Sequence, residues 1–285
     1  MTPAAFERIV WSHYRAHRRD MPWRDSVSPY RVIVSEVMLQ QTQVGRVLTR
    51  FPRFIRRFPG WKALATASNK AVLQEWSGLG YNRRALYLKR IAEALTDGGA
   101  RAASVPRTGE GLRKLPGIGP NTAGAVMAFA FNAPVPFIET NIRSAYLHHF
   151  FPRARRAVPD AALMPIIERT LKDAVRRGPF KDNAREWYWA LMDYGSHLKG
   201  AMPNPSRRSA HHKKQGAFEG SNRQLRAALL KRLLAGPAAE SALARAFAGR
   251  WPAGAVRKAL GALEREGFIA LRGAPGRGGN IFRIV

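Results

Sequence analysis

Two glutamates are the strongest candidates for acid chemistry in this chain. Glu36 lies in the run PYRVIVSEVML, where valine, isoleucine, methionine and leucine surround it. A carboxyl group in apolar surroundings has a raised pKa and can hold a proton near neutral pH, as a general acid must. An isolated buried glutamate is more often structural, bonded to backbone amides or to an arginine. Burial therefore leaves both interpretations of Glu36 open.

Glu139 is the second candidate, and it directly precedes the helical run TNIR. Paired with a protonated Glu36, it would suit a reaction in which one acid donates a proton and the other stabilises a developing cation, as in glycoside cleavage. The alternative is a helix-capping or solvent-facing acid, since this run could start a helix with Thr140 or Asn141 as the cap. The sequence spacing does not show that the two glutamates meet.

The turn LPGIGP at residues 115–120 lies between the two acids and is suited to gripping a phosphate. Gly117 and Gly119 permit positive φ and a close approach of the backbone to another chain. The free N–H groups and the dipole of the helix that follows favour a phosphate oxygen. The alternative is a plain tight turn between two helices. Contacts of this kind position a protein on duplex DNA without reading its sequence, and the carbonyl groups of the turn could also hold a monovalent cation.

The charge of the chain indicates its partner. A formal net charge of +29 over 285 residues repels itself unless a polyanion takes it up, so double-stranded DNA is the expected partner. The alternative is a set of solubilising arginines. Cysteine is absent, which excludes thiolate zinc sites and an iron–sulfur cluster. No apolar run approaches the roughly 20 residues that span a bilayer, and no signal peptide opens the chain, so we expect a location in the cytoplasm, associated with the nucleoid. Separately, we expect a monomer.

The hydrophobic pattern predicts an all-α fold for the first 200 residues, because helical spacing recurs there and no alternating strand is evident. Residues 201–221 are polar, basic and rich in turn formers, which indicates a linker. Residues 222–285 contain three helical runs and then the short strands FIALR and IFRIV. Three helices followed by a hairpin indicate a small winged-helix-like α+β domain; the alternative is a generic helical tail.

Four stretches carry a family resemblance: MPWRDSVSPYRVIVSEVMLQQTQV, WSGLGYNRRALYL, LPGIGPNTAGAV and ALMDYG. Over roughly residues 1–200 the chain resembles the A/G-specific adenine DNA glycosylases of the helix-hairpin-helix superfamily, which also contains endonuclease III. The resemblance implies two helical subdomains, one from about 28–137 and one from 1–27 with 138–200. It also implies hydrolysis of the N-glycosidic bond of a flipped-out adenine opposite guanine or 8-oxoguanine.

The resemblance also assigns roles to residues. Glu36 matches the glutamate that protonates the departing adenine, Glu139 falls where the family has an aspartate that stabilises the sugar cation, and Asn141 joins them as a catalytic residue. Residues lining the base pocket would be Trp23, Arg24, Asn121 and Trp189. Gln41 and Tyr81 match residues that wedge into the base stack. The further DNA contacts implied or expected are Leu39, Thr42, Gly117, Gly119, Arg143, Arg207, Arg208, Lys213 and Lys214.

Several departures from the family pattern matter. Glu139 is one methylene longer than aspartate, which displaces its carboxylate by roughly 1.5 Å unless the backbone compensates, and misplacement on that scale can cost about a hundredfold in rate. Lys199 stands where the first cysteine of the iron–sulfur loop would be, so the basic residues after it would replace the DNA contacts of that loop. Trp189 replaces a polar glutamate or glutamine that touches the base.

Asn121 occupies the position of the Schiff-base lysine of bifunctional relatives. An amide cannot form an imine, so we expect a monofunctional enzyme without a lysine-dependent lyase step. One alternative is excision of uracil or thymine opposite guanine, with Asn121 and Trp189 retuned for a pyrimidine. The other is a non-catalytic DNA-binding protein on the same scaffold, in which Glu139 marks the lost catalytic residue.

Overall fold

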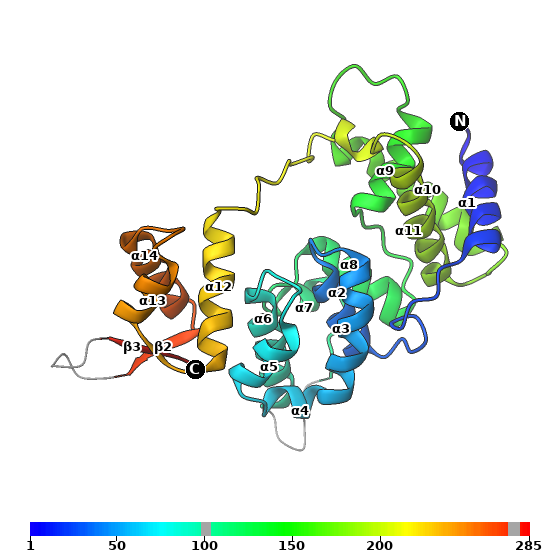
Figure 1. Cartoon of the computed structure of the whole chain (residues 1–285). Helices are drawn as coiled ribbons and strands as arrows, with labels where there is room; N and C mark the ends of the chain where they lie inside the picture. The colour runs from blue at the N-terminus through cyan, green and yellow to red at the C-terminus, as the bar shows by residue number, and fades with distance from the viewer. Residues whose placement is uncertain (98–103, 273–279) are drawn as a thin grey trace. The chain divides into compact units, whose positions relative to one another are not determined.

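The computed structural model describes residues 1–97, 104–272 and 280–285 (Figure 1). They divide into two compact units, and each unit combines two separate parts of the chain. The first unit is Met1–Val37 with Ser104–Lys214, and the second is Met38–Ala103 with Gln215–Val285. This grouping differs from the subdomains expected from the family resemblance, since residues 104–137 fall with the N-terminal helix. The expected domain bounds stay predictions.

The first unit is helical. Apart from one β-bridge between Val158 and Ser209, helices supply all the regular structure described for it, as predicted. Its elements are α1 (Pro3–His17), most of α2 (Pro29–Leu39), α7 (Gly109–Arg113), α8 (Pro120–Phe131), α9 (Thr140–Phe150), α10 (Asp160–Arg177), α11 (Ala184–Ala201) and the short 3-10 helix η2 (Pro205–Arg208). None of the helices in the described residues is long and apolar enough to cross a membrane.

Helix α11 is the central packing element of this unit, and it lies against α9, α1 and α10. Its start is fixed by Asn183, whose side chain accepts a hydrogen bond from the Glu186 amide. The core around it is aromatic: the ring centroids of Trp11 and Trp187 lie 5.2 Å apart, and those of Phe6 and Tyr146 lie 4.8 Å apart. Burial of such large rings supplies much of the stabilisation that holds the helices together.

Helices α9 and α11 approach so closely that only a glycine fits between them. A Cβ atom placed on Gly195 would lie 2.0 Å from the Asn141 carbonyl oxygen. Neither backbone can move away without displacing its own helix. The glycine therefore sets the position of the first turn of α9, which carries Asn141 and follows Glu139.

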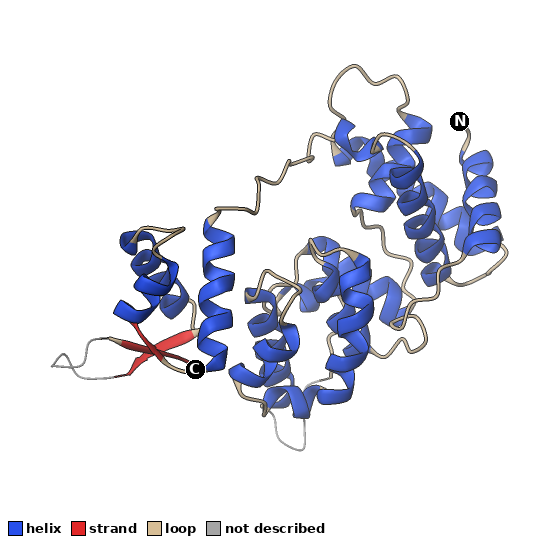
Figure 2. Cartoon of the chain, viewed as in Figure 1, coloured by secondary structure: helices blue, strands red, loops and turns tan. Residues whose placement is uncertain are grey.

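The second unit consists of a helical part and a small α+β part. The helical part is made of α3 (Val44–Arg57), α4 (Trp61–Ala65), α5 (Asn69–Trp76) and α6 (Arg83–Thr96). The other part follows from α12 (Asn222–Ala235) through β1 (Ala238–Ala239), α13 (Glu240–Phe247), α14 (Ala253–Arg265), β2 (Ile269–Arg272) and β3 (Ile281–Ile284). Figure 2 shows the strands confined to this last part.

The α+β part has the winged-helix arrangement that was predicted. Its antiparallel sheet has the order β1-β3-β2, with Ile269 opposite Ile284 and Leu271 opposite Phe282. Helix α12 begins at Asn222, where the sequence placed the start of this domain. Strand β1 was not predicted because two residues are too few to show alternation. The tip of the predicted hairpin, residues 273–279, lies outside the described residues.

The prediction of a linker at 201–221 is correct only for its second half. Helix α11 runs on to Ala201, and Pro205, Ser206 and Ser209 are buried. Arg208, expected to contact DNA, instead donates to the carbonyl oxygens of Leu147, Phe151 and Pro152 at 3.1, 3.0 and 2.8 Å. Residues 205–210 are thus fastened to the end of α9, whereas residues 211–220 are exposed throughout.

The close approach of α9 and α11 gives a testable consequence. Gly195→Ala should lower the free energy of unfolding by several kcal/mol, since overpacking against backbone typically costs about 1–3 kcal/mol or more. Gly200→Ala in the last turn of the same helix is the matched control, because nothing lies within 4 Å of a Cβ atom there. It should leave stability unchanged or raise it by up to about 1 kcal/mol. Equal denaturation midpoints for the two variants would contradict this packing.

Candidate active site

The structure places Glu36 and Glu139 in the same unit, where the charge of one acts on the other. Glu36 lies in the middle of α2 with Val32, Ile33 and Val37 buried around it, and its own side chain is partly exposed. Burial raises the pKa of Glu36 to about 8, and the negative charge of Glu139 acts in the same direction. This repulsion is a Coulombic interaction, which weakens with the distance between the two carboxyl groups and is screened less inside the protein than in water. At neutral pH, Glu36 therefore holds a proton beside a second acid.

Glu139 is held by the start of α9. Its Oε1 accepts hydrogen bonds from the backbone amides of Asn141 and Ile142 at 2.7 and 2.8 Å. Glu139 is itself the N-cap of α9, which is the helix-capping role given above as its alternative, whereas Thr140 and Asn141 do not cap this helix. Burial raises the pKa of Glu139, whereas the Ile142 amide, Lys199, the Asn141 amide and Arg143 oppose that rise. The helix terminus thus fixes where this carboxylate lies.

Asn141 lies beside the carboxylate, as its predicted catalytic role requires. Its Nδ2 donates to Oε2 of Glu139 at 3.2 Å. Its Oδ1 is buried and has no hydrogen-bond partner within the described part of the chain. A buried acceptor without a partner is costly and is typical of functional sites. The three predicted catalytic residues therefore lie within one unit, and two of them are directly bonded.

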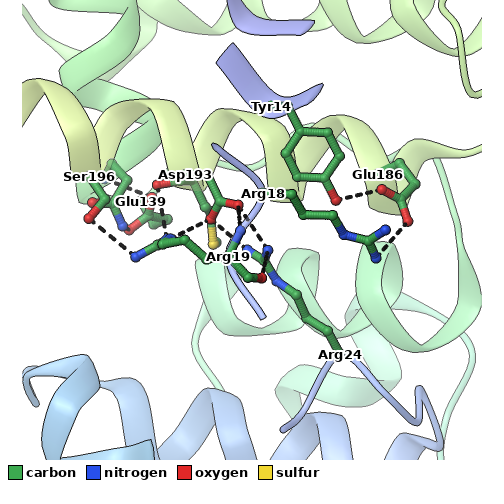
Figure 3. Close-up of polar contacts among 10 residues, drawn as sticks. Tyr14, Arg18, Arg19, Arg24, Glu139, Glu186, Asp193 and Ser196 are labelled. Atoms are coloured by element: carbon green, nitrogen blue, oxygen red, sulfur yellow. Dashed lines mark hydrogen bonds and ion pairs between the residues drawn. The ribbon is translucent and has the colours of Figure 1, made fainter. Parts of the chain in front are cut away.

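Asp193 organises the other side of this region. Arg24 bonds it through both terminal nitrogens at 2.9 and 2.8 Å, and Nε of Arg19 donates to it at 2.7 Å. Figure 3 shows both arginines converging on Asp193 from the segment after α1. Burial alone would raise the pKa of Asp193, but the two arginines outweigh burial and lower it below its ordinary value. This buried, doubly paired carboxylate fixes the segment that precedes α2.

The predicted base-pocket residues are mostly packed within the first unit. The Arg24 side chain is 6% exposed and its guanidinium lies 5.2 Å from the ring of Trp189. Trp189 also stacks on Phe129 of α8, with ring centroids 6.3 Å apart. Trp23 is buried as well. The structure places these three residues in the protein core, where they hold its shape, and leaves Asn121 exposed in the first turn of α8.

The glycine turn before α8 uses its two glycines differently. Gly117 has φ of 76°, which favours glycine, whereas Gly119 is the N-cap of α8 with an ordinary φ of −85°. Both are exposed. Of the two glycines, only Gly117 therefore uses the positive φ that glycine permits. The exposed start of α8 remains suited to a phosphate oxygen.

Comparison with known proteins agrees with this arrangement. Residues 34–166 match the family described as HhH-GPD superfamily base excision DNA repair protein. The chain contains an HhH-GPD domain.

Relatives named adenine DNA glycosylase are similar to about two thirds of the chain. The protein of Mycobacterium tuberculosis (strain CDC 1551 / Oshkosh) is 39% identical over 66% of this chain and 59% of its own length. That of Rattus norvegicus is 36% identical over 64% of this chain and 37% of its own. The chain thus spans about three fifths of the first of these relatives and less of the second.

Solved structures show the same fold at low identity. A thermostable thymine-DNA glycosylase superposes with a TM-score of 0.58 at 20% identity, over 73% of this chain and 92% of that one. Endonuclease III in a trapped covalent DNA intermediate gives 0.53 at 16% identity, over 72% and 94%. The predicted helix-hairpin-helix glycosylase fold is confirmed.

In the second unit, two loops contain the predicted wedge residues. Gln41 is exposed with φ of 52°, and Tyr81 is 37% exposed with φ of 48°. Leu39 ends α2, and Thr42 follows Gln41 in the first loop. Sequence reasoning missed the residue that joins the loops, the buried Arg84. Its position on the apolar face of α6, four residues before Leu88, is the signal that could have identified it.

Among the predicted DNA contacts, Arg143 has a partner inside the protein. Its guanidinium bonds both carboxylate oxygens of Asp160 at 2.8 and 2.7 Å and is 12% exposed. This pairing joins α9 to the first residue of α10 and assigns Arg143 a structural role. Arg207, Lys213 and Lys214 are exposed and stay predictions.

Repulsion between the two acids predicts a measurable shift. Glu139→Gln removes a negative charge near Glu36 and should lower the pKa of Glu36 from about 8, by about one pH unit for a charge pair of this kind. A carboxyl-carbon NMR titration of Glu36 would measure it. Glu168→Gln, an exposed position on α10, is the control and should leave the pKa in place. An unchanged Glu36 pKa in Glu139→Gln would show that the acids do not interact.

Proposed function

We propose that this chain is a monofunctional DNA glycosylase, which hydrolyses the N-glycosidic bond of a mispaired base in duplex DNA. The favoured substrate is adenine opposite guanine or 8-oxoguanine. The proposal is carried by Glu36, whose pKa is raised to about 8 by burial and by the charge of Glu139, within a region that matches the HhH-GPD family. The similarity to adenine DNA glycosylases supports the choice of base.

The two acids divide the chemistry between them. Glu36 donates its proton to a ring nitrogen of the flipped-out base, which makes the base a better leaving group. As the glycosidic bond breaks, positive charge develops on the sugar, and the Glu139 carboxylate stabilises it. Water then adds to the sugar carbon and leaves an abasic site. Because Glu36 must be protonated, the rate should fall as the pH rises through about 8.

The extra methylene of Glu139 fits this mechanism. Hydrogen bonds from Asn141 and Ile142 fix its carboxylate at the start of α9, so the longer side chain is folded back onto the helix terminus. A carboxylate held in this way is positioned before the reaction begins, as electrostatic stabilisation requires. Its placement beside Glu36 argues against the interpretation of a non-catalytic scaffold.

The reaction proceeds without a lysine nucleophile. Asn121 occupies the first turn of α8, where an amide cannot form an imine with the sugar. Iron–sulfur ligation is excluded by the absence of cysteine, and the carbonyl groups of the turn at Gly117 are candidates for a monovalent cation. The partner is double-stranded DNA, which the proposed monomer would meet at the nucleoid in the cytoplasm.

A second candidate function is excision of thymine or uracil opposite guanine. Trp189 favours it, because an indole stacked on Phe129 offers a single N–H donor and fewer recognition bonds to adenine than a glutamate or glutamine. Recognition of a purine edge depends on such polar partners. The choice of base therefore rests on residues other than Trp189.

A panel of duplexes tests the proposal. Oligonucleotides with a single A:G, A:8-oxoguanine, U:G or T:G pair would be incubated with the protein and then treated with hot alkali. Strand breaks should occur at the A-containing pairs and only after alkali, and Glu36→Gln should reduce them at least about a hundredfold. Breaks at T:G or U:G alone would favour the second candidate. Tight binding without an abasic site in any duplex would refute the enzyme.

Binding should also depend on salt through the exposed lysines. Lys213→Ala with Lys214→Ala should reduce the slope of log affinity against log salt by about 0.9 for each phosphate that is no longer neutralised. Replacing Arg169 and Lys172 on α10 by alanine removes the same charge from another exposed face and is the control. Equal slopes for the two double variants would contradict a role of 213–214 in contacting DNA.

A further inference from the structure

We propose that Arg84 is a positioning residue that sets the conformation of both wedge loops, the residues 38–42 with Gln41 and the residues 78–81 with Tyr81. The inference rests on the proposed function and on the family resemblance, which implies that Gln41 and Tyr81 enter the base stack. Both loops and Arg84 belong to the second unit. The contacts of this one side chain connect the two loops.

Both wedge residues have a backbone conformation that needs support. Gln41 and Tyr81 have φ of 52° and 48°, in the left-handed region that L residues seldom adopt. Such a conformation is energetically costly and persists only where surrounding contacts hold it. Gln41 is exposed and Tyr81 is 37% exposed, so packing of their own side chains supplies only part of those contacts. The rest must come from contacts to the backbone of the loops.

Arg84 supplies it from the first turn of α6. Its side chain is buried, and its guanidinium donates to the Met38 carbonyl at 2.9 Å, to the Gln40 carbonyl and to the Thr42 hydroxyl at 2.9 Å. These three acceptors surround Gln41. The backbone on both sides of this wedge residue is therefore attached to one rigid group.

The same guanidinium holds the second loop. It donates to the carbonyl oxygens of Gly80 at 2.9 Å, Leu79 at 3.3 Å and Tyr81 at 3.3 Å. The Thr42 hydroxyl also donates to the Leu79 carbonyl at 3.3 Å, so the two loops are joined directly as well. One planar fork with five N–H donors can span two loops in this way, whereas a lysine ammonium cannot.

Aromatic rings complete the arrangement. The guanidinium carbon lies 5.2 Å from the ring centroid of Trp76 and 5.4 Å from that of Tyr81. The hydroxyl of Tyr81 accepts a hydrogen bond from Arg223 of α12 at 3.1 Å, so this ring is held at both ends.

Burying a cation is expensive, and an apolar side chain would serve stability alone at lower cost. The placement of Arg84 is thus explained by the geometry it imposes on the wedges.

Base unstacking measures that geometry apart from excision. In the Glu36→Gln background, a duplex with 2-aminopurine opposite guanine should brighten on binding as the probe leaves the stack. Arg84→Lys should make this rise at least threefold smaller while the Kd changes less than threefold. With Glu36 present, Arg84→Lys should slow single-turnover excision about a hundredfold, because displacement by about 1 Å has that effect. Arg53→Lys, an exposed arginine paired with Glu75, is the control and should change neither quantity.

A double-mutant cycle separates positioning from general stability. In a background with Gln41→Gly and Tyr81→Gly there are no wedges left to position, so Arg84→Lys should slow excision less than threefold further. Equal slowing in both backgrounds would overturn the proposal, as would an Arg84→Lys variant with the wild-type rate. If circular dichroism shows that Arg84→Lys does not fold, Thr42→Val serves in its place, because it removes one link between the two loops. Thr42→Val should slow excision about tenfold when Gln41 and Tyr81 are present and should have no such effect when both are replaced by glycine.

The outcomes also separate this inference from the proposed function. A wild-type protein that excises no base, but whose Glu36→Gln form unstacks 2-aminopurine in an Arg84-dependent way, would refute the glycosylase and support the positioning role. If the wild type excises a base and neither Arg84→Lys nor Thr42→Val slows that excision, the glycosylase is supported and the positioning role is refuted.

Discussion

The proximity of two carboxyl groups is the constraint on which the first unit depends. Glu36 has a pKa of about 8 in the folded chain against an ordinary value of 4.5. Because its folded pKa is raised, the protonated form is favoured in the native state, and stability falls as the pH rises from about 4.5 to 8. Above about pH 8, the folded state bears the whole loss of stability that the raised pKa of Glu36 causes. The acid that the proposed chemistry needs is therefore a group that opposes folding at neutral pH, and other contacts must compensate.

Helix α11 provides much of that compensation through the stretch ALMDYG. Asp193 binds Arg19 and Arg24 and so fixes the segment leading into α2, which carries Glu36. Two residues later, Gly195 lets the first turn of α9 approach, which sets the position of Glu139. One helix thereby positions both acids, from two sides. The motif acts through packing and ion pairing, and its residues need not touch a substrate to be necessary.

Local patterns predicted the parts of the structure that depend on local physics. The apolar run around Glu36, the turn at Gly117 and the start of the winged helix at Asn222 were all readable from residue type and spacing. The partners of Arg24, Arg143 and Arg208 were not, because each arginine bonds a group 17 to 169 residues away or a backbone carbonyl. Arg24 was expected to line the base pocket, and Arg143 and Arg208 were expected to contact DNA. Only the fold shows which arginines are already engaged.

The excess of 48 basic over 19 acidic residues has a structural consequence of its own. With few carboxylates to pair with, several arginines bond helix C-termini, where the last carbonyl groups lack partners and the dipole is negative. Arg84 does so at the end of α2, Arg208 at the end of α9, and Arg185 at the end of α8, where it donates to the Phe129 carbonyl at 2.6 Å.

Such arginines stabilise the fold and contribute to the net charge without being free to contact a phosphate. The value of +29 therefore overstates the charge that can meet DNA, and a salt dependence calculated from composition would be too steep. Exposed cations such as Arg207, Lys213 and Lys214 supply the surface charge that can contact a phosphate. The buried arginines instead hold the backbone that positions this surface.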